Sequence, residues 1–199
     1  QLPVFYYAKP TSIYGPGEEI PCPSYTQELD YELEVAYVIG KEGRDIRKEA
    51  AGDYLFGLMI MNDWSARDMQ RVETRVRLGP TKAKDFATSL GPWLVTTDEL
   101  SDRALDRTGV YNLEMIARVN GQEMTRGNLA HIYYSFGDLI ERASASCTLY
   151  PGDVFGSGTV GNGCLLELTA GKGPWLKPGD RVELEVDGLG KLMNTVVTD

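Results

Sequence analysis

One short stretch of the sequence brings an acid, a base and an amide together where an apolar run ends. In LMIMNDWSARDMQRVE, residues 58–73, the apolar run stops at Asp63, and Arg67 and Gln70 follow. On a helix these three side chains would fall within about 60° of one another. The pattern is typical of an N-capping aspartate with an i,i+4 ion pair on a wet surface. It is also compatible with one side of an active site, so other parts of the chain must decide.

Two glutamates lie on the strand that we expect before this stretch. In DYELEVAYVIG, Glu32 and Glu34 alternate, so both project from one face of the strand, while Tyr31, Leu33 and Val35 take the other. Two ionised carboxylates beside an apolar sheet are costly unless water or a cation compensates them. The pair is therefore either a solvent-facing patch at a strand edge or part of a cation site.

Together with Asp63, the two glutamates offer a donor set made only of oxygen atoms. Three carboxylates suit Mg²⁺, Mn²⁺ or Ca²⁺ rather than zinc. Arg67, Gln70 and a lysine from KAKDF could then hold a carboxylate or an oxyanion next to the metal. These residues predict a mononuclear site that polarises an oxo acid, without fixing the reaction.

The single histidine and the three cysteines indicate no second site. One histidine cannot build a multi-histidine metal site, and an apolar stripe over residues 129–144 predicts an amphipathic helix with His131 on its exposed face. Cys22, Cys147 and Cys164 are far apart and show no C-x-x-C spacing. We expect them to be small buried residues of a reduced, cytoplasmic protein.

Composition and turn signals indicate one mainly β domain. The chain has 199 residues, of which 42% are hydrophobic and 25% charged, and its 22 glycines and 10 prolines indicate many turns. Asn120-Gly121 between two alternating runs predicts a type I′ hairpin, and we expect a strand in GCLLELTAG. The expected fold is mainly antiparallel β, rolled or sandwiched, with a few short helices.

Charge and hydropathy exclude some partners. A net charge of −9 makes nucleic acid an unsuitable partner. The sequence has no run of 18 apolar residues and no signal peptide, and we expect no membrane partner and a cytoplasmic location.

Four segments in fixed order resemble the signature motifs of the fumarylacetoacetate hydrolase family. They are YELEVAYVIG, MNDWSARDMQ, LGPTKAKDFATSLGPWLV and GDVFGSGTVG, and the similarity runs nearly end to end. The E-L-E pattern alone is weak, but the ordered set is specific. The resemblance implies one catalytic domain over residues 1–199 with a fumarylacetoacetase-type β-roll. It also implies a homodimer and a bound Mg²⁺, with Mn²⁺ or Ca²⁺ as alternatives.

The resemblance also implies roles for individual residues. The metal-binding carboxylates of the family fall on Glu32, Glu34 and Asp63. Its substrate-contacting arginine and glutamine, which also stabilise oxyanions, fall on Arg67 and Gln70.

Further family residues match at other places along the chain. The active-site lysine falls on Lys84 rather than Lys82, and the threonine of the SGT motif falls on Thr159. Tyr6 matches a substrate-contacting tyrosine, and Glu167 matches a glutamate that orients the catalytic histidine in fumarylacetoacetase.

The function implied by the resemblance is a metal-dependent hydrolase. It would cleave a carbon–carbon bond in a 1,3-diketo acid of the fumarylacetoacetate or acylpyruvate type, through an enolate that the metal stabilises. The alternatives are a metal-dependent isomerase or oxaloacetate decarboxylase acting on keto-diacids, and a non-catalytic domain that binds a metal and a metabolite.

The family's hydrolytic members carry a catalytic histidine upstream of where this sequence begins, and His131 does not match that motif. Either the chain is a piece of a longer protein or it works without that histidine; because it starts with QLPVFYY, without methionine, we expect the former.

Overall fold

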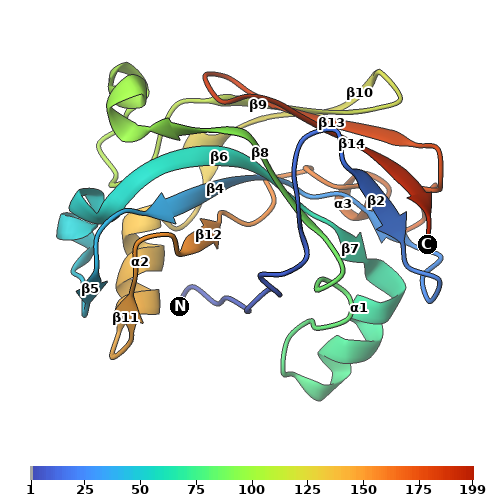
Figure 1. Cartoon of the computed structure of the whole chain (residues 1–199), viewed down its shortest axis with the longest axis horizontal. Helices are drawn as coiled ribbons and strands as arrows, with labels where there is room; N and C mark the ends of the chain where they lie inside the picture. The colour runs from blue at the N-terminus through green and yellow to red at the C-terminus, as the bar shows by residue number, and fades with distance from the viewer. Residues whose placement is uncertain (1) are drawn as a thin grey trace.

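Two five-stranded sheets form the frame of the molecule (Figure 1). This computed structural model describes residues 2–199. The strands of the first sheet are, in spatial order, β1 (Ile13–Tyr14), β8 (Thr88–Thr96), β6 (Leu55–Asp63), β4 (Leu33–Ile39) and β12 (Val154–Gly156). The strands of the second are β10 (Gln122–Asn128), β9 (Glu114–Val119), β13 (Arg181–Val186), β14 (Gly190–Thr198) and β2 (Glu19–Cys22). The mainly β expectation is confirmed.

The pairing is antiparallel except at one edge of each sheet. In the first sheet β1 pairs with β8 in parallel, and in the second β2 pairs with β14 in parallel. Two small ribbons complete the strands: β11 (Thr148–Leu149) with β5 (Gly43–Arg44), and β3 (Leu29–Asp30) with β7 (Ser65–Ala66). In the second ribbon, β3 precedes β4 and β7 joins β6 to the first helix. The ribbon therefore holds the start of this helix beside the ends of β4 and β6.

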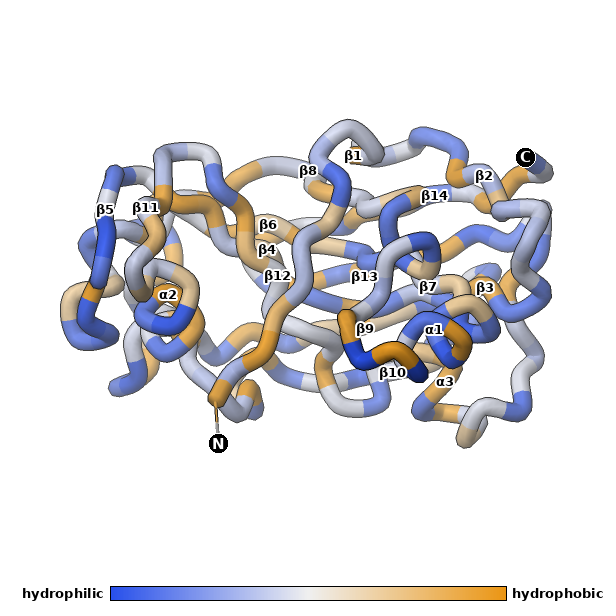
Figure 2. The backbone as a smooth tube through the Cα atoms, turned by 90° about the horizontal axis from the view of Figure 1, so that it is seen from below, coloured by the Kyte–Doolittle hydropathy of each residue, from blue (hydrophilic) through white to orange (hydrophobic). Residues whose placement is uncertain are grey.

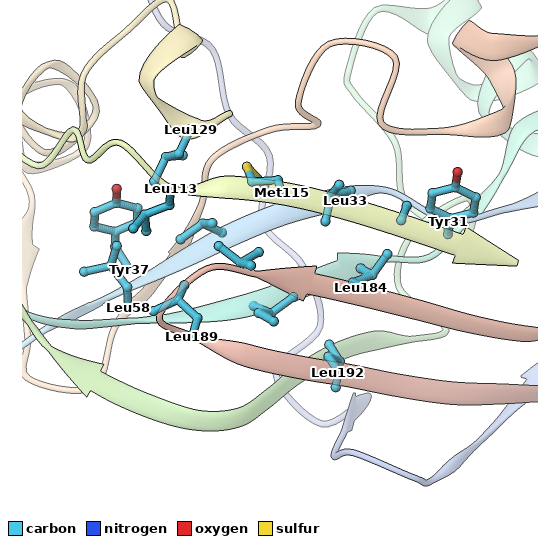
Figure 3. Close-up of a cluster of buried hydrophobic side chains, with 14 of the residues drawn as sticks. Tyr31, Leu33, Tyr37, Leu58, Leu113, Met115, Leu129, Leu184, Leu189 and Leu192 are labelled. Atoms are coloured by element: carbon cyan, nitrogen blue, oxygen red, sulfur yellow. The ribbon is translucent and has the colours of Figure 1, made fainter. Parts of the chain in front are cut away.

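The main core lies between the two sheets. Strand β4 is buried along its whole length, as expected for the middle of a covered sheet, whereas β13 alternates between buried and half-exposed positions. Leu33 and Leu58 of the first sheet and Leu184 and Leu192 of the second belong to one buried cluster, and Figure 3 labels these side chains. This apolar layer fixes the register of β4, which in turn places its acidic residues.

The helices are short. The α-helices are α1 (Arg67–Glu73), α2 (Phe136–Ser144) and α3 (Leu165–Leu168), and the 3₁₀ helices are η1 (Lys48–Tyr54), η2 (Thr74–Val76), η3 (Thr97–Arg103) and η4 (Leu129–His131). Helix α2 starts late because Ser135 and Asp138 form a capping box at its N-terminus. The expected helix over residues 129–144 is therefore two elements, and His131 is exposed, as predicted, but on η4.

The structure confirms the predicted hairpin but not the predicted strand at residues 163–171. Asn120 and Gly121 both have positive φ, at 51° and 81°, which confirms the type I′ hairpin between β9 and β10. The strand expected in GCLLELTAG is wrong, because residues 165–168 form helix α3. The three cysteines are free, but only Cys164 is fully buried, whereas Cys147 is exposed. Within residues 2–199, none of the helices has the length and apolar character needed to span a membrane.

Candidate metal centre and active site

Three carboxylates converge at the ends of β4 and β6. Glu34 lies on β4, Glu32 directly precedes it, and Asp63 is the last residue of β6. Leu33 pairs with Asn62, so the next residues outward, Glu32 and Asp63, face each other across the two strands. One ligand oxygen from each of the three carboxylates lies within 4.8 Å of the others. We call this set the carboxylate triad.

The position of Asp63 corrects one expectation. Asp63 does not start a helix, because residues 65–66 continue as strand β7 and α1 begins only at Arg67. Arg67 and Gln70 do share a face of α1, where the Arg67 Nη1 donates to the Gln70 Oε1 at 3.0 Å. The strand end and the helix thus meet at the site from different elements.

The triad is buried rather than solvent-facing. Glu32 is 9% exposed, Glu34 3% and Asp63 2%. Burial raises the pKa of Glu34 well above its usual range, and the neighbouring Glu32 and Asp63 charges add to that rise. Burial also raises the pKa of Asp63, in spite of a nearby lysine. The alternative of a solvated acidic patch is therefore wrong.

The donor set fits a hard divalent cation. Three buried carboxylates at this spacing repel one another, and a divalent ion between them would relieve that repulsion. The Asp63 Oδ1 atom is buried and has no hydrogen-bond partner among the described residues, so one ligand lone pair is unused. Oxygen-only donors suit Mg²⁺, Mn²⁺ or Ca²⁺.

Lys84 links two members of the triad. Its Nζ donates to the Glu32 Oε2 at 2.6 Å and to the Asp63 Oδ2 at 2.9 Å, and its side chain is 3% exposed. Burial alone would lower the pKa of Lys84, but the Asp63 and Glu32 charges outweigh it and raise the pKa. Lys82 instead pairs with Asp85 at the surface. The geometry thus supports Lys84 as the lysine of the site.

Glu32 and Tyr6 complete the surroundings of Lys84. Burial alone would raise the pKa of Glu32, but Lys84 and Arg67 outweigh burial and lower it. The Tyr6 hydroxyl donates to the Asp63 Oδ2, which places the N-terminal segment beside the triad. Burial, followed by the Asp63 charge, raises the pKa of Tyr6, so its hydroxyl keeps its proton.

Arg67 is a buried cation, and one of its guanidinium nitrogens has no partner among the described residues. Its Nε donates to the Asp30 Oδ2 and its Nη1 to the Glu32 Oε1, both at 2.8 Å, and its side chain is 3% exposed. The Arg67 Nη2 is buried without a partner among the described residues. Such a donor is costly unless a ligand uses it, which makes Nη2 a suitable contact for an oxo-acid oxygen.

Asp30 is a site residue that sequence reasoning missed. It is 0% exposed. Its Oδ1 accepts from the backbone nitrogens of Tyr31 and Leu165, and its Oδ2 accepts from Arg67 and from the backbone nitrogen of Leu166. Burial raises the pKa of Asp30, while Arg67 and these N–H groups oppose the rise. A signal was present, because Asp30 continues the alternation of acidic residues in DYELE.

The last two predicted residues, Thr159 and Glu167, lie in different places relative to the triad. The backbone N–H of Gly158 donates to the Glu34 Oε2 at 3.0 Å, which places the loop with the half-buried Thr159 next to the triad. Glu167, on α3, is exposed, and within residues 2–199 it has no side-chain hydrogen bond or ion pair to a residue of the site. The structure therefore does not bring Glu167 to the triad.

Comparison with known proteins shows the family to which this chain is related. The family model described as fumarylacetoacetate (FAA) hydrolase C-terminal matches residues 1–197. "Oxaloacetate tautomerase fahd2, mitochondrial" of Xenopus laevis is 38% identical over 196 residues, which cover 98% of this chain and 58% of that protein. "Oxaloacetate tautomerase FAHD2A, mitochondrial" of Homo sapiens is 36% identical, with 98% and 59% covered. The chain thus spans a little under three fifths of these relatives.

Solved structures of similar fold cover nearly the whole chain. The 5-carboxymethyl-2-hydroxymuconate delta-isomerase of Mycobacterium smegmatis matches with a TM-score of 0.81 and 34% identity, covering 100% of this chain and 71% of that one. The fumarylacetoacetate hydrolase of Exiguobacterium antarcticum matches with a TM-score of 0.84 and 31% identity, covering 98% and 66%. Matched over nearly its whole length, this chain belongs to the fumarylacetoacetate hydrolase family and has its β-roll fold.

Proposed function

We propose that this chain carries the catalytic centre of a metal-dependent tautomerase or isomerase that moves a proton between carbon and oxygen of a 2-oxo acid. The observation that carries the proposal is the buried triad with Lys84 bridging Glu32 and Asp63. Two relatives are named oxaloacetate tautomerases and one solved neighbour is named an isomerase, which favours this alternative over carbon–carbon bond hydrolysis. The homodimer and the cytoplasmic location stay predictions.

The metal would be held by Glu32, Glu34 and Asp63. When bound there, a divalent cation supplies a positive charge that stabilises negative charge on a substrate oxygen. The chain supplies the other contacts. The free Nη2 of Arg67 and the nearby amide of Gln70 can hold the substrate carboxylate, since Arg67 already aligns Gln70.

Lys84 can move the proton. An ammonium group has three N–H donors, and Lys84 uses two of them on Glu32 and Asp63, so one remains for the substrate. If Nζ gives a proton to the enol carbon and regains one from the enol oxygen, the lysine is unchanged and no water is consumed. The Tyr6 hydroxyl keeps its proton and donates it in a hydrogen bond to Asp63, so Tyr6 covers the Asp63 side of the site.

The test is the conversion of an enol to its keto form. Freshly dissolved enol-oxaloacetate loses its ultraviolet absorbance as it tautomerises, and this chain with Mg²⁺ should accelerate the loss, while EDTA should remove the effect. Lys84→Met should reduce the rate by roughly 10²- to 10⁴-fold, the usual contribution of a positioned acid–base group. Lys82→Met is the matched control, because Lys82 lies at the surface two residues earlier.

Product analysis separates the alternatives. A tautomerase leaves the carbon skeleton intact, so neither carbon dioxide nor cleavage products should form. Release of pyruvate and carbon dioxide would identify a decarboxylase, and cleavage of an acylpyruvate into two acids would identify a hydrolase. An unchanged rate in Lys84→Met would contradict the assigned role of the lysine. Tight Mg²⁺ binding without turnover of any of these substrates would favour the non-catalytic alternative.

A further inference from the structure

A cavity of about 520 Å³ lies beside the loop that follows β12. Its walls include residues 2–4, residues 157–161 and part of η4, with His131 among the lining residues. Figure 2 shows the N-terminal segment running past β12 on the side of the molecule that faces the viewer. Two of its walls, residues 2–4 and residues 157–161, come from segments that are far apart in the sequence.

Both of these segments also reach the carboxylate triad. Gly158 lines the cavity, and its backbone N–H donates to the Glu34 Oε2 at 3.0 Å. Val4 lines the cavity, and two residues later Tyr6 donates to Asp63. Two segments that line the cavity therefore also contact the triad, so the cavity and the triad are neighbours.

The lining has a distinctive chemistry. Met115, Leu129, Ile132 and Val160 give it apolar walls, and no aspartate, glutamate, lysine or arginine among residues 2–199 lines it. A quarter of the chain is charged, so a lining without these residues differs from the average surface. A carboxylate entering this space would lose water and gain no cation of the Lys or Arg type.

We propose that this cavity receives the substituent on the reacting carbon of the oxo acid, and that this substituent is uncharged, for example an aryl group. The inference rests on the proposed function, which places the carboxylate and oxo groups at the triad. A cavity of about 150 Å³ can hold benzene, so the volume here is ample for a ring. The cavity thus favours bulkier, neutral oxo acids over a small dianion such as oxaloacetate.

Three non-reacting probes test the proposal without turnover. Oxamate, N-phenyloxamate and N-oxalylglycine share one oxamate head, which carries hydrogen, a phenyl ring or a charged carboxymethyl group. In titration calorimetry with Mg²⁺ present, N-phenyloxamate should bind roughly tenfold more tightly than oxamate, because its ring leaves water. N-oxalylglycine should bind no more tightly than oxamate.

Two variants locate the effect. Gly161 lines the cavity, and a Cβ there would meet no atom within 4 Å, so Gly161→Leu adds a side chain to open space. This variant should remove the advantage of N-phenyloxamate and leave oxamate binding unchanged. Gly52→Leu is the matched control, because Gly52 is exposed on η1 outside the cavity and a Cβ there makes only ordinary contact.

A charge introduced into the wall should reverse the preference. His131→Lys places a permanent positive charge at the lining and should tighten N-oxalylglycine relative to N-phenyloxamate. Tyr150→Lys controls for net charge, since Tyr150 is 55% exposed and lies outside the cavity lining.

Each outcome decides the proposal. If oxamate binds but N-phenyloxamate gains nothing, or if N-oxalylglycine binds most tightly, the uncharged-substituent inference is wrong while the proposed function stands. An advantage of N-phenyloxamate that survives in Gly161→Leu places its ring elsewhere and also overturns the inference. If none of the three probes binds, the oxo-acid site is wrong, and the inference and the proposed function fail together.

Discussion

Replacement of Asp30 by asparagine tests how much the buried Asp30–Arg67 ion pair stabilises the protein. Asparagine keeps one carbonyl oxygen that can accept from the Tyr31 and Leu165 nitrogens. Its amide NH₂ would then face the Arg67 Nε and the Leu166 nitrogen, which are both donors. The change therefore breaks two hydrogen bonds and leaves the Arg67 guanidinium without one of its two buried carboxylate partners.

The expected cost is large because neither partner reaches water. Arg67 is 3% exposed and Asp30 0%, and breaking a buried ion pair of this kind costs about 3–5 kcal/mol. For a protein of this size each kcal/mol lowers Tm by about 2–4 °C, so Tm should fall by roughly 6–20 °C. Asp68→Asn, one residue after Arg67, is the control, because Asp68 is only partly buried and bonds to Thr26 and Gln27.

The assay is a double-mutant cycle by urea denaturation, which uses Asp30→Asn, Arg67→Met and both together. If Asp30 acts through Arg67, the double variant should be more stable than the sum of the single losses predicts, by at least about 1 kcal/mol. If the losses in free energy of unfolding are additive, Asp30 stabilises the fold only through its hydrogen bonds to backbone N–H groups and not through Arg67. A loss below about 1 kcal/mol in Asp30→Asn would refute the reasoning about the buried pair.

Three further predictions concern the metal, the sheet and pH. Mg²⁺ at about 100 times its Kd should add about 2.7 kcal/mol to the free energy of unfolding, and Asp63→Asn should lose this gain in a thermal melt. Gly57→Ala should lower the free energy of unfolding by at least about 2 kcal/mol in urea, because a Cβ would lie 2.4 Å from the Val95 carbonyl oxygen on β8; a stable variant would contradict the close packing. Burial alone would raise the pKa of Asp68, but hydrogen bonds from Gln27 and Thr26 outweigh it and lower the pKa. Its stabilisation is therefore present above about pH 4 and lost below it, so Asp68→Asn should flatten the acid limb of a stability–pH curve, by less than about 1 kcal/mol because the group is partly exposed.

Much of the site could be predicted because it follows a local period. Glu32 and Glu34 share a face of a strand whose other face is apolar, and that alternation depends only on neighbouring residues. The hairpin at Asn120 and Gly121 was predictable for the same reason, since its turn needs positive φ at both residues. Local chemistry determines these features.

The errors arose where distant segments decide the local structure. Asp63 was placed on a helix because the residues after it have a helical spacing, but Ala66 bonds to the Ala83 carbonyl and stays extended in β7. Helix α3 was expected to be a strand, yet the carboxylate of Asp30 caps its first N–H groups from far away in the sequence. The exposure of Glu167 follows from that helix. Propensity within one segment cannot reveal such contacts.

A calorimetric titration of Mg²⁺ into the wild-type chain and into Glu34→Gln and Asp63→Asn tests whether the carboxylate triad binds a metal ion. We expect one Mg²⁺ per chain in the wild type and strongly weakened binding in both variants, because each carboxylate supplies a ligand oxygen of the buried triad. Glu18→Gln, an exposed carboxylate outside the triad, should bind Mg²⁺ like the wild type. Binding that persists in both triad variants, or that is missing in the wild type, would mean that the triad is not the metal site.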